Sequence, residues 1–305
     1  MEVVVSGDEV RVGPRFSVAF QRTLRIPEDG KEYPLPPGLG RLPVHRVGDF
    51  RGRLPSRWAD DELFIPLYQR EALWLAFDGA WWKPNAVQVG VGGVNAVSGT
   101  GWGEELVPSP QNYLVCPDQP WLDGINAGDG FVRQFVAVPL GEGRTVEGQV
   151  TGREERGGIQ LRVFEPRPGR FPDEPPTQGQ DAGAAGMPQR SASLGLGAGG
   201  RIRQRIYPDP YGVEAWDPAA AEVACHILNA DEYLGATGRR PPPSPITAET
   251  YAEWGLPWFD LYDEGVGDVP GPEALSGLEP AGADEADPSV AVDPEHVRKI
   301  RRSGE

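Results

Sequence analysis

The sequence has few of the residues on which most catalytic and metal-binding sites depend. It contains two cysteines and three histidines in 305 residues. They form neither a disulfide framework nor an HExxH or CxxC pattern, so no zinc site is indicated. A GxSxG nucleophile motif and complete dinucleotide or P-loop glycine motifs are also missing. These absences argue against the common hydrolase, metalloenzyme and nucleotide-binding classes.

Long apolar runs are missing as well. No window approaches the ~18 consecutive apolar residues that a membrane-spanning helix needs. The first residues, Met1 to Glu9, show no basic segment followed by an apolar one, which is the pattern of a signal peptide. We therefore expect a soluble, cytoplasmic protein with no transmembrane segment.

Basic side chains are outnumbered, and the imbalance is uneven along the chain. The net charge is −16, and residues 241–305 hold 14 acidic but only 4 basic side chains. An acidic chain repels phosphate backbones, so we expect no nucleic-acid partner. The stretch 264–295 is also rich in proline and glycine, and we predict that the whole tail, 264–305, is disordered.

Glycine and proline are abundant, with 41 and 33 residues, while apolar residues make up 39%. This balance favours short strands and turns over a helical bundle. Residues 16–26 and 86–97 are typical of strands, and residues 63–77 of two elements broken by a polar step. Apolar alternation between glycine turns over residues 131–165 predicts an antiparallel meander with strands near 132–138, 146–150 and 159–164.

The later part of the chain mixes strands with short helices. Residues 201–206 and 222–228 have the pattern of strands. Asn229 and Glu232 have the spacing of a capping box that opens a helix, and Thr247 is placed to cap a second one. The sequence therefore predicts an α+β fold with a β-rich antiparallel main body and a few short helices in its C-terminal part.

Composition also predicts how the chain is divided. Residues 1–165 form a β-rich main domain. Residues 166–200 form a flexible linker, because 14 of these 35 residues are glycine or proline. Residues 201–263 form a small αβ element packed on the main domain, and the acidic tail 264–305 follows.

The densest polar cluster lies at residues 118–134. Asp123, Asn126 and Asp129 are close enough in sequence to converge around a hard cation or a polar ligand, with Arg133 beside them. The spacing is not that of an EF-hand. The alternative is a structural turn in which these side chains hydrogen-bond backbone N–H groups. Both interpretations stay open from the sequence, which assigns no cofactor.

Cys116 is the one plausible nucleophile. A cysteine enzyme needs a histidine as proton acceptor, and only His45, His226 and His296 exist. The alternative is a buried free cysteine, which is common at strand ends.

Seven runs of the sequence together carry a resemblance. They are Arg22–Pro27, Tyr33–Gly40, Pro66–Trp74, Tyr113–Pro117, Gly124–Gly130, Arg133–Ala137 and Gly255–Asp263. The chain resembles, over roughly residues 16–265 apart from the linker, a family of uncharacterised actinobacterial-type and fungal proteins, some labelled "integral membrane protein". The resemblance implies no activity and no catalytic residue. Its membrane label disagrees with the hydropathy, and we expect the hydropathy to hold.

The scarcity of catalytic residue types decides the functional prediction. We expect a non-enzymatic binding or interaction protein. The alternative is a hydrolase that uses Cys116 or the loop with Asp123, Asn126 and Asp129.

Overall fold

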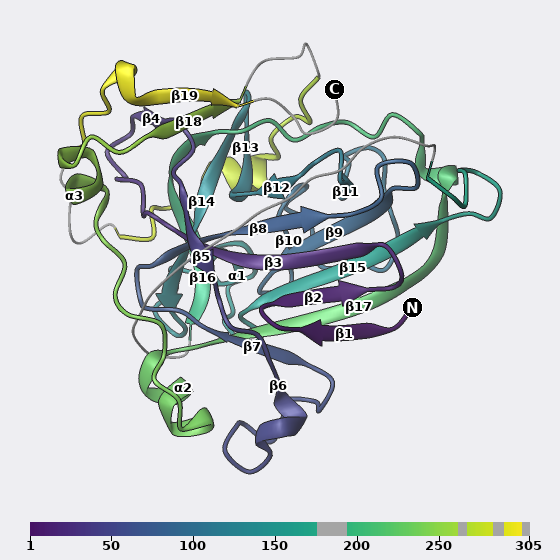
Figure 1. Cartoon of the computed structure of the whole chain (residues 1–305), viewed down its shortest axis with the longest axis horizontal. Helices are drawn as coiled ribbons and strands as arrows, with labels where there is room; N and C mark the ends of the chain where they lie inside the picture. The colour runs from purple at the N-terminus through teal and green to yellow at the C-terminus, as the bar shows by residue number, and fades with distance from the viewer. Residues whose placement is uncertain (176–193, 262–266, 283–289, 301–305) are drawn as a thin grey trace.

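The computed structural model describes residues 1–175, 194–261, 267–282 and 290–300. Within these residues the chain forms two large sheets of mostly antiparallel strands and one small parallel ribbon (Figure 1). The prediction of a β-rich antiparallel body is confirmed.

The larger sheet has ten strands. Its main path runs through β1 (Val3–Ser6), β2 (Glu9–Val12), β3 (Phe16–Thr23), β8 (Ala72–Asp78), β14 (Phe131–Pro139), β16 (Leu194–Arg203) and β4 (Glu32–Tyr33). Three further strands pair beside this path: β5 (Gly38–Arg41) with β3, β12 (Trp121–Leu122) with β8, and β13 (Gly124–Gly128) with β14.

The second sheet has seven strands. They follow the order β10 (Val94–Asn95), β9 (Asn85–Val91), β15 (Ile159–Pro166), β17 (Trp216–Leu228), β7 (Leu63–Pro66) and β6 (His45–Arg46), with β11 (Leu114–Cys116) beside β9. β17 and β7 run parallel, whereas β15 is antiparallel to both its neighbours.

The two sheets share one hydrophobic core. Val18 and Leu75 of the larger sheet belong to the same buried cluster as Val89, Leu161 and Val223 of the second sheet. Because side chains alternate between the faces of a strand, each sheet turns one apolar face toward the other. Figure 1 shows the long strands β3, β8, β9, β15 and β17 crossing the middle of the molecule with a similar tilt, although paired neighbours run antiparallel.

Among the described residues there are four short α-helices and three 3-10 turns. They are α1 (Val146–Thr151), α2 (Ala230–Thr237), α3 (Ala248–Glu253), α4 (Glu273–Ser276), η1 (Val47–Phe50), η2 (Val213–Ala215) and η3 (Pro294–His296). The capping box of α2 is present, and Thr247 caps α3 as predicted. The placement of the helices in the C-terminal part is wrong for α1, which lies in the first half of the chain.

Of the three consecutive strands predicted over residues 131–165, the first and the last are present as β14 and β15, but the middle one is wrong. Residues 146–151 form α1 instead of a strand, and β14 and β15 lie in different sheets. Val146 and Val150 are four residues apart, a spacing that also suits one helix face. Thr145 decides the outcome, because its hydroxyl accepts a hydrogen bond from the Gly148 N–H and caps the helix.

The predicted linker, residues 166–200, extends too far toward the C-terminus. Residues 194–200 form the first part of β16, which pairs with β14 along its length. The glycines here are required by close packing, since a Cβ on Gly199 would lie 2.5 Å from Val136 Cγ2. Residues 166–175 continue from β15, and the remaining linker prediction, 176–193, falls outside the described residues. β16 and β17 are strands within the two sheets, so residues 201–263 are not a separate element packed on them.

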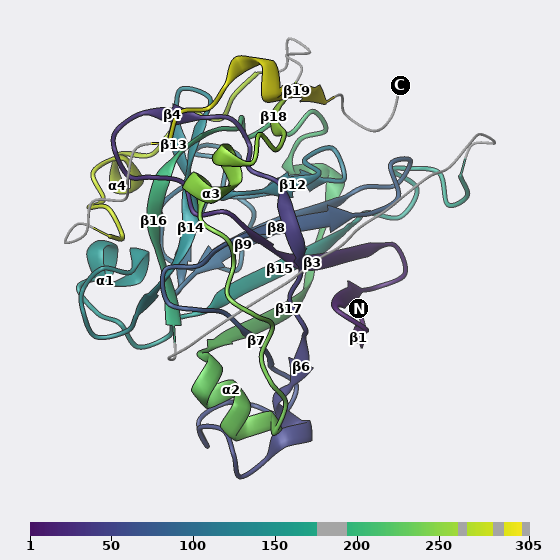
Figure 2. The same cartoon turned by 60° about the vertical axis from the view of Figure 1, so that its left-hand side comes forward.

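The predicted disordered tail is wrong for the residues that the structure describes. β18 (Trp258–Leu261) and β19 (Val297–Ile300) form the parallel ribbon. Residues 267–282, which we call the strap, run between these strands and include α4. Figure 2 brings α4, β13, β16 and α1 to the same side of the molecule. The composition of this segment did not predict its order, because only a few of its side chains are buried.

The four α-helices of the described chain are short. Across the described ranges, no helix combines the length and apolar character needed to cross a bilayer.

Candidate functional site

The loop predicted as the site forms the hairpin of β13 and β14. The pairing register shifts between Asn126 and Gly128, and Gly128, Asp129 and Gly130 then adopt φ angles of 77°, 55° and 78°. Glycine adopts positive φ without strain, and aspartate is one of the few other residues that tolerate it. The turn therefore projects Asp129 out of the hairpin, where its side chain is exposed.

Asp123 does not belong to an open site. It is 2% exposed. Its N–H donates to Gln204 Oε1 at 2.9 Å, and Gln204 Nε2 donates to Asp123 Oδ2 at 2.8 Å. Burial raises the pKa of Asp123 to about 7, and the hydrogen bond from Gln204 acts in the opposite direction. The carboxyl group is an internal link between the hairpin and the chain that follows β16.

Asn126 is equally buried, and its side chain organises three backbone segments. Its Oδ1 accepts a hydrogen bond from the Gly128 N–H at 2.9 Å. Its Nδ2 lies 3.1 Å from the carbonyl oxygen of Val97. The same nitrogen lies 3.3 Å and 3.2 Å from the carbonyl oxygens of Val269 and Pro270. Asn126 thus fastens the strap to the hairpin.

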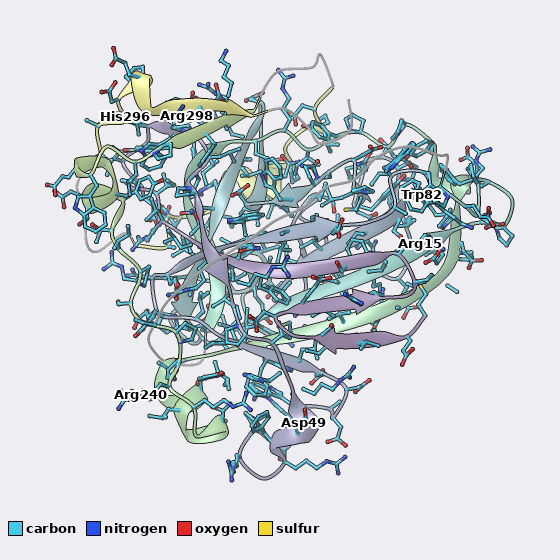
Figure 3. The ribbon with its side chains drawn as sticks, viewed as in Figure 1. Arg15, Asp49, Trp82, Arg240, His296 and Arg298 are labelled. Carbon is cyan, nitrogen blue, oxygen red and sulfur yellow. The ribbon has the colours of Figure 1, made fainter. Side chains whose placement is uncertain are left out.

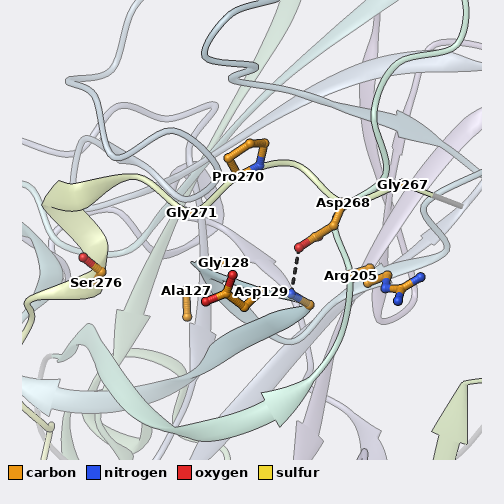
Figure 4. Close-up of a pocket in the computed structure, with 10 residues that line it drawn as sticks. Ala127, Gly128, Asp129, Arg205, Gly267, Asp268, Pro270, Gly271 and Ser276 are labelled. Atoms are coloured by element: carbon orange, nitrogen blue, oxygen red, sulfur yellow. Dashed lines mark hydrogen bonds between the residues drawn. The ribbon is translucent and has the colours of Figure 1, made fainter.

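A cavity of about 690 Å³ opens beside the turn. One wall is the hairpin and the other is the strap (Figure 4). The lining residues are Ala127, Gly128, Asp129, Gly130, Arg205, Gly267, Asp268, Pro270, Gly271 and Ser276. Polar groups from two distant parts of the chain therefore face one space.

Asp268 closes the inner side of this cavity. Its Oδ2 accepts a hydrogen bond from the Gly130 N–H at 2.7 Å, and its Oδ1 accepts one from the Ile206 N–H at 3.0 Å. In Figure 4 the Asp129 carboxylate and the Arg205 side chain lie on opposite sides of the Gly130–Asp268 bond. The Asp129 carboxylate makes no hydrogen bond with any residue of the described chain. Of the two carboxylates that line the cavity, Asp129 is the one that accepts no hydrogen bond from the described chain.

Arg133 is not among the residues that line the cavity. Its Nε and Nη2 donate to the carbonyl oxygens of Gly199 and Ala198 at 3.3 Å and 3.2 Å, and its Nη1 donates to that of Leu278. Burial lowers the pKa of Arg133 from its ordinary value, while Glu28 and Glu279 raise it. The guanidinium group holds the strap against β16.

The four predicted site residues are thus brought to one hairpin but not to one point. Asp123 is internal, Asn126 and Arg133 bind the strap, and Asp129 faces the cavity. Within the described ranges, no group of three or more His, Cys, Asp or Glu side chains is placed to hold a metal ion.

Cys116 ends β11 and is 1% exposed. Burial, with a smaller contribution from the negative charge of Asp118, raises the pKa of this thiol well above its ordinary value. A nucleophilic cysteine needs the opposite shift and access to substrate. The thiol has the environment of a core side chain.

The three histidines have other partners. They are Tyr233 Oη for His45 at 2.8 Å, Glu62 Oε2 for His226 at 2.9 Å, and Asp293 Oδ2 for His296 at 3.9 Å. His226 also stacks on Trp58 with ring centroids 3.8 Å apart. Figure 3 places His296 at the edge of the molecule, where it ends η3 just before β19. The predicted pairing of Cys116 with a histidine finds no support in these contacts.

Sequence reasoning missed the second wall of the cavity. Asp268, Gly271 and Ser276 lie in the tail that composition marked as disordered. The only signal there was the pair Leu275 and Leu278, two aliphatic residues one helical turn apart in a polar segment. Both are buried.

Comparison with known proteins adds no further assignment. No family model, no curated protein and no solved structure matches the chain. The geometry of the site therefore carries the functional argument.

Proposed function

We propose that the protein is a binding protein that takes a small polar ligand in the cavity beside Asp129. One observation carries the proposal. The Asp129 carboxylate faces a cavity of about 690 Å³ without an intramolecular hydrogen bond in the described chain. A volume of this size falls within the range of ~300–1,000 Å³ that is usual for small-molecule sites.

The cavity wall indicates the chemistry of the ligand. Asp129 is an acceptor with negative charge, so the ligand presents an ammonium group or several hydroxyl donors to it. Asp268 already accepts one backbone N–H on each of its carboxylate oxygens, whereas both oxygens of Asp129 accept none from the described chain. The Ser276 hydroxyl and the backbone of the turn supply further polar contacts. An amine or a polyol fits this set better than an apolar molecule.

The alternative, a hydrolase, has weaker support. Cys116 is buried and its thiol is held in the protonated form, while a nucleophile needs a base within hydrogen-bond reach. Asp123 is turned inward to Gln204, so Asp123 and Asp129 do not form a pair across an open site. Neither proposed catalytic group has a partner with which to act.

The proposal also covers the cellular location of the protein, the class of its partner and its family. The absence of a spanning segment in the sequence supports a soluble, cytoplasmic protein. The net charge of −16 supports a partner other than nucleic acid. Membership of the family that the seven sequence runs resemble remains part of the proposal and assigns no activity.

Ligand-dependent thermal stabilisation tests the proposal. Glucosamine carries an ammonium group where glucose has a hydroxyl group. These two sugars, together with Ca²⁺ and Mg²⁺, form a first panel of probes. A ligand at 100 times its Kd stabilises the folded state by about 2.7 kcal/mol, which raises the Tm by several degrees. We expect a shift with the amine or the polyol and its loss in Asp129→Asn.

Asp129→Asn is the informative variant because asparagine keeps the size of the side chain and tolerates positive φ. The unliganded Tm should therefore change little. Glu142→Gln is the matched control, since Glu142 is exposed on another glycine turn and carries the same charge. Equal ligand shifts in wild type and Asp129→Asn, or no shift with any probe, would contradict the proposal.

A further inference from the structure

The cavity beside Asp129 carries side chains of both charges. Asp129 and Asp268 in its lining are acidic, and Arg205 is basic. Figure 4 shows the Asp129 carboxylate on one side of the Gly130–Asp268 hydrogen bond and the Arg205 side chain on the other. The cavity therefore has an anionic end and a cationic end.

Asp268 fixes the backbone from which both of these side chains project. Its Oδ2 accepts a hydrogen bond from the N–H of Gly130, the residue after Asp129. Its Oδ1 accepts one from the N–H of Ile206, the residue after Arg205. Hydrogen bonds to an ionised carboxylate are stronger than those between neutral groups. The two segments are thus clipped together beside the two charged side chains before a ligand arrives, which reduces the cost of binding.

Gly130 sets the course of the Arg205 side chain. A Cβ on Gly130 would lie 3.6 Å from Arg205 Cγ and 3.7 Å from Arg205 Nε. The arginine stem therefore lies along the turn that also carries Asp129. Arg205 makes a further interaction within the chain. Its guanidinium group has five N–H donors, so it can serve more than one partner at a time.

The two ends distinguish ligands by their charge. An amine that lacks an acid group is attracted by Asp129 and repelled by Arg205, and an acid that lacks an amino group experiences the reverse. A molecule with an ammonium group at one end and a carboxylate at the other matches both. Asp268 adds negative charge between the ends, and Arg205 is the cation that the described lining provides for the carboxylate. Arginine and carboxylate groups pair through charge-assisted, often bidentate hydrogen bonds.

We propose that the ligand of this cavity is a small zwitterion of the ω-amino acid class, with its ammonium group on Asp129 and its carboxylate on Arg205. The inference rests on the function proposed above and adds a second recognition point to it. The two side chains lie on opposite sides of the Gly130–Asp268 bond, so the two charges of the ligand stand at the two ends of a carbon chain.

Three probes with the same hexyl chain test this inference: 6-aminohexanoate, hexylamine and hexanoate. Their Kd values are measured by isothermal titration calorimetry on the full-length protein at pH 7. We expect wild type to bind 6-aminohexanoate at least tenfold more tightly than either singly charged probe. In Arg205→Gln the preference over hexylamine should disappear, while hexylamine itself binds at least as well as to wild type. In Asp129→Asn the preference over hexanoate should disappear.

Two further variants serve as controls. Arg205→Lys keeps the positive charge and should retain part of the preference, which separates loss of the charge from loss of packing on Gly130. Arg203→Gln removes one positive charge from a residue that pairs with Asp260 and does not line the cavity. It should bind all three probes as wild type does.

The comparison of the three probes on wild type is decisive even where a variant does not fold. Binding of hexylamine or glucosamine that depends on Asp129, without a preference for 6-aminohexanoate, would overturn the zwitterion and leave the small-ligand site intact. An undiminished preference in Arg205→Gln would overturn it in the same way. No binding of any probe, sugars and ions included, would contradict the proposed function and the zwitterion with it.

Discussion

Gly128 and Gly271 lie back to back, and neither position has room for a side chain. A Cβ on Gly271 would stand 2.5 Å from the Gly128 nitrogen, and a Cβ on Gly128 would stand 3.0 Å from Gly271 Cα. The first glycine belongs to the hairpin and the second to the strap. Both glycines also line the cavity beside Asp129, so their contact joins its two walls.

Gly271→Ala should therefore loosen the strap. The added methyl group meets backbone, which cannot move aside cheaply, and overpacking of this kind costs about 1–3 kcal/mol. We expect faster hydrogen exchange of strap amides, while those of β3 and β14 change little. Gly277→Ala is the matched control in the same segment, because a Cβ there meets nothing within 4 Å and φ is −91°. Equal effects of the two substitutions would show that the glycine contact does not hold the strap.

The sequence predicted the parts of the fold that follow from local patterns. Strand β3 follows from its apolar and β-branched residues, and α2 from the capping box of Asn229 and Glu232. The prediction failed where contacts between residues far apart in the sequence determine the structure. Gly195 and Gly197 look like linker residues, yet they permit a strand to lie under α1 and the strap. No propensity scale contains that information.

The same reasoning applies to the site. Asp129 was found because a polar residue among glycines is typical of a tight turn. The roles of Asn126 and Arg133 could not be predicted, because their hydrogen-bond partners lie far along the chain, in residues 198–199 and 269–278. Asp268 was missed because its segment is ordered by contacts made to its backbone.

Asp123→Asn should remove a pH dependence from the stability. Burial raises the pKa of Asp123 from 3.8 to about 7. Between about pH 4 and pH 7 the folded protein therefore keeps a proton that the unfolded chain has released, and stability falls as the pH rises. At ~1.4 kcal/mol for each pKa unit, the free energy of unfolding has fallen by about 4 kcal/mol once the pH exceeds 7.

Asparagine keeps an oxygen acceptor for Gln204 and carries no charge, so the variant should be more stable than wild type at pH 8. Urea unfolding at pH 4, 5, 6, 7 and 8 measures the difference. Glu142→Gln, an exposed carboxylate, should follow the wild-type curve. Parallel curves for wild type and Asp123→Asn would show that this carboxyl does not titrate with folding.

Arg22 and Glu71 form an ion pair inside the molecule, with side-chain exposures of 0% and 1%. Burial raises the pKa of Glu71 to about 7, and the charge of Arg22 opposes this. Arg22→Met leaves the carboxylate without its partner, which should cost about 3–5 kcal/mol at pH 8. The loss should shrink as the pH falls and Glu71 takes up a proton.

The double variant Arg22→Met/Glu71→Met separates loss of the pair from loss of one charge. Because it leaves no unpaired charge, it should be less destabilised than the sum of the single variants, measured by urea unfolding. Strict additivity would show that the two side chains do not act as a pair.

Thiol reactivity decides between a core cysteine and a nucleophile at Cys116. Cys116 and Cys225 are 1% and 2% exposed, and burial raises the pKa of both thiols. A thiol that is both protonated and covered reacts slowly with alkylating and disulfide reagents. The native protein should therefore release almost no chromophore from an aromatic disulfide reagent, and both thiols should react after unfolding in guanidinium. Cys225→Ser assigns any residual signal, because only Cys116 then remains. Native-state modification of Cys116 faster than that of free glutathione at pH 7 would contradict the structure and restore the hydrolase alternative.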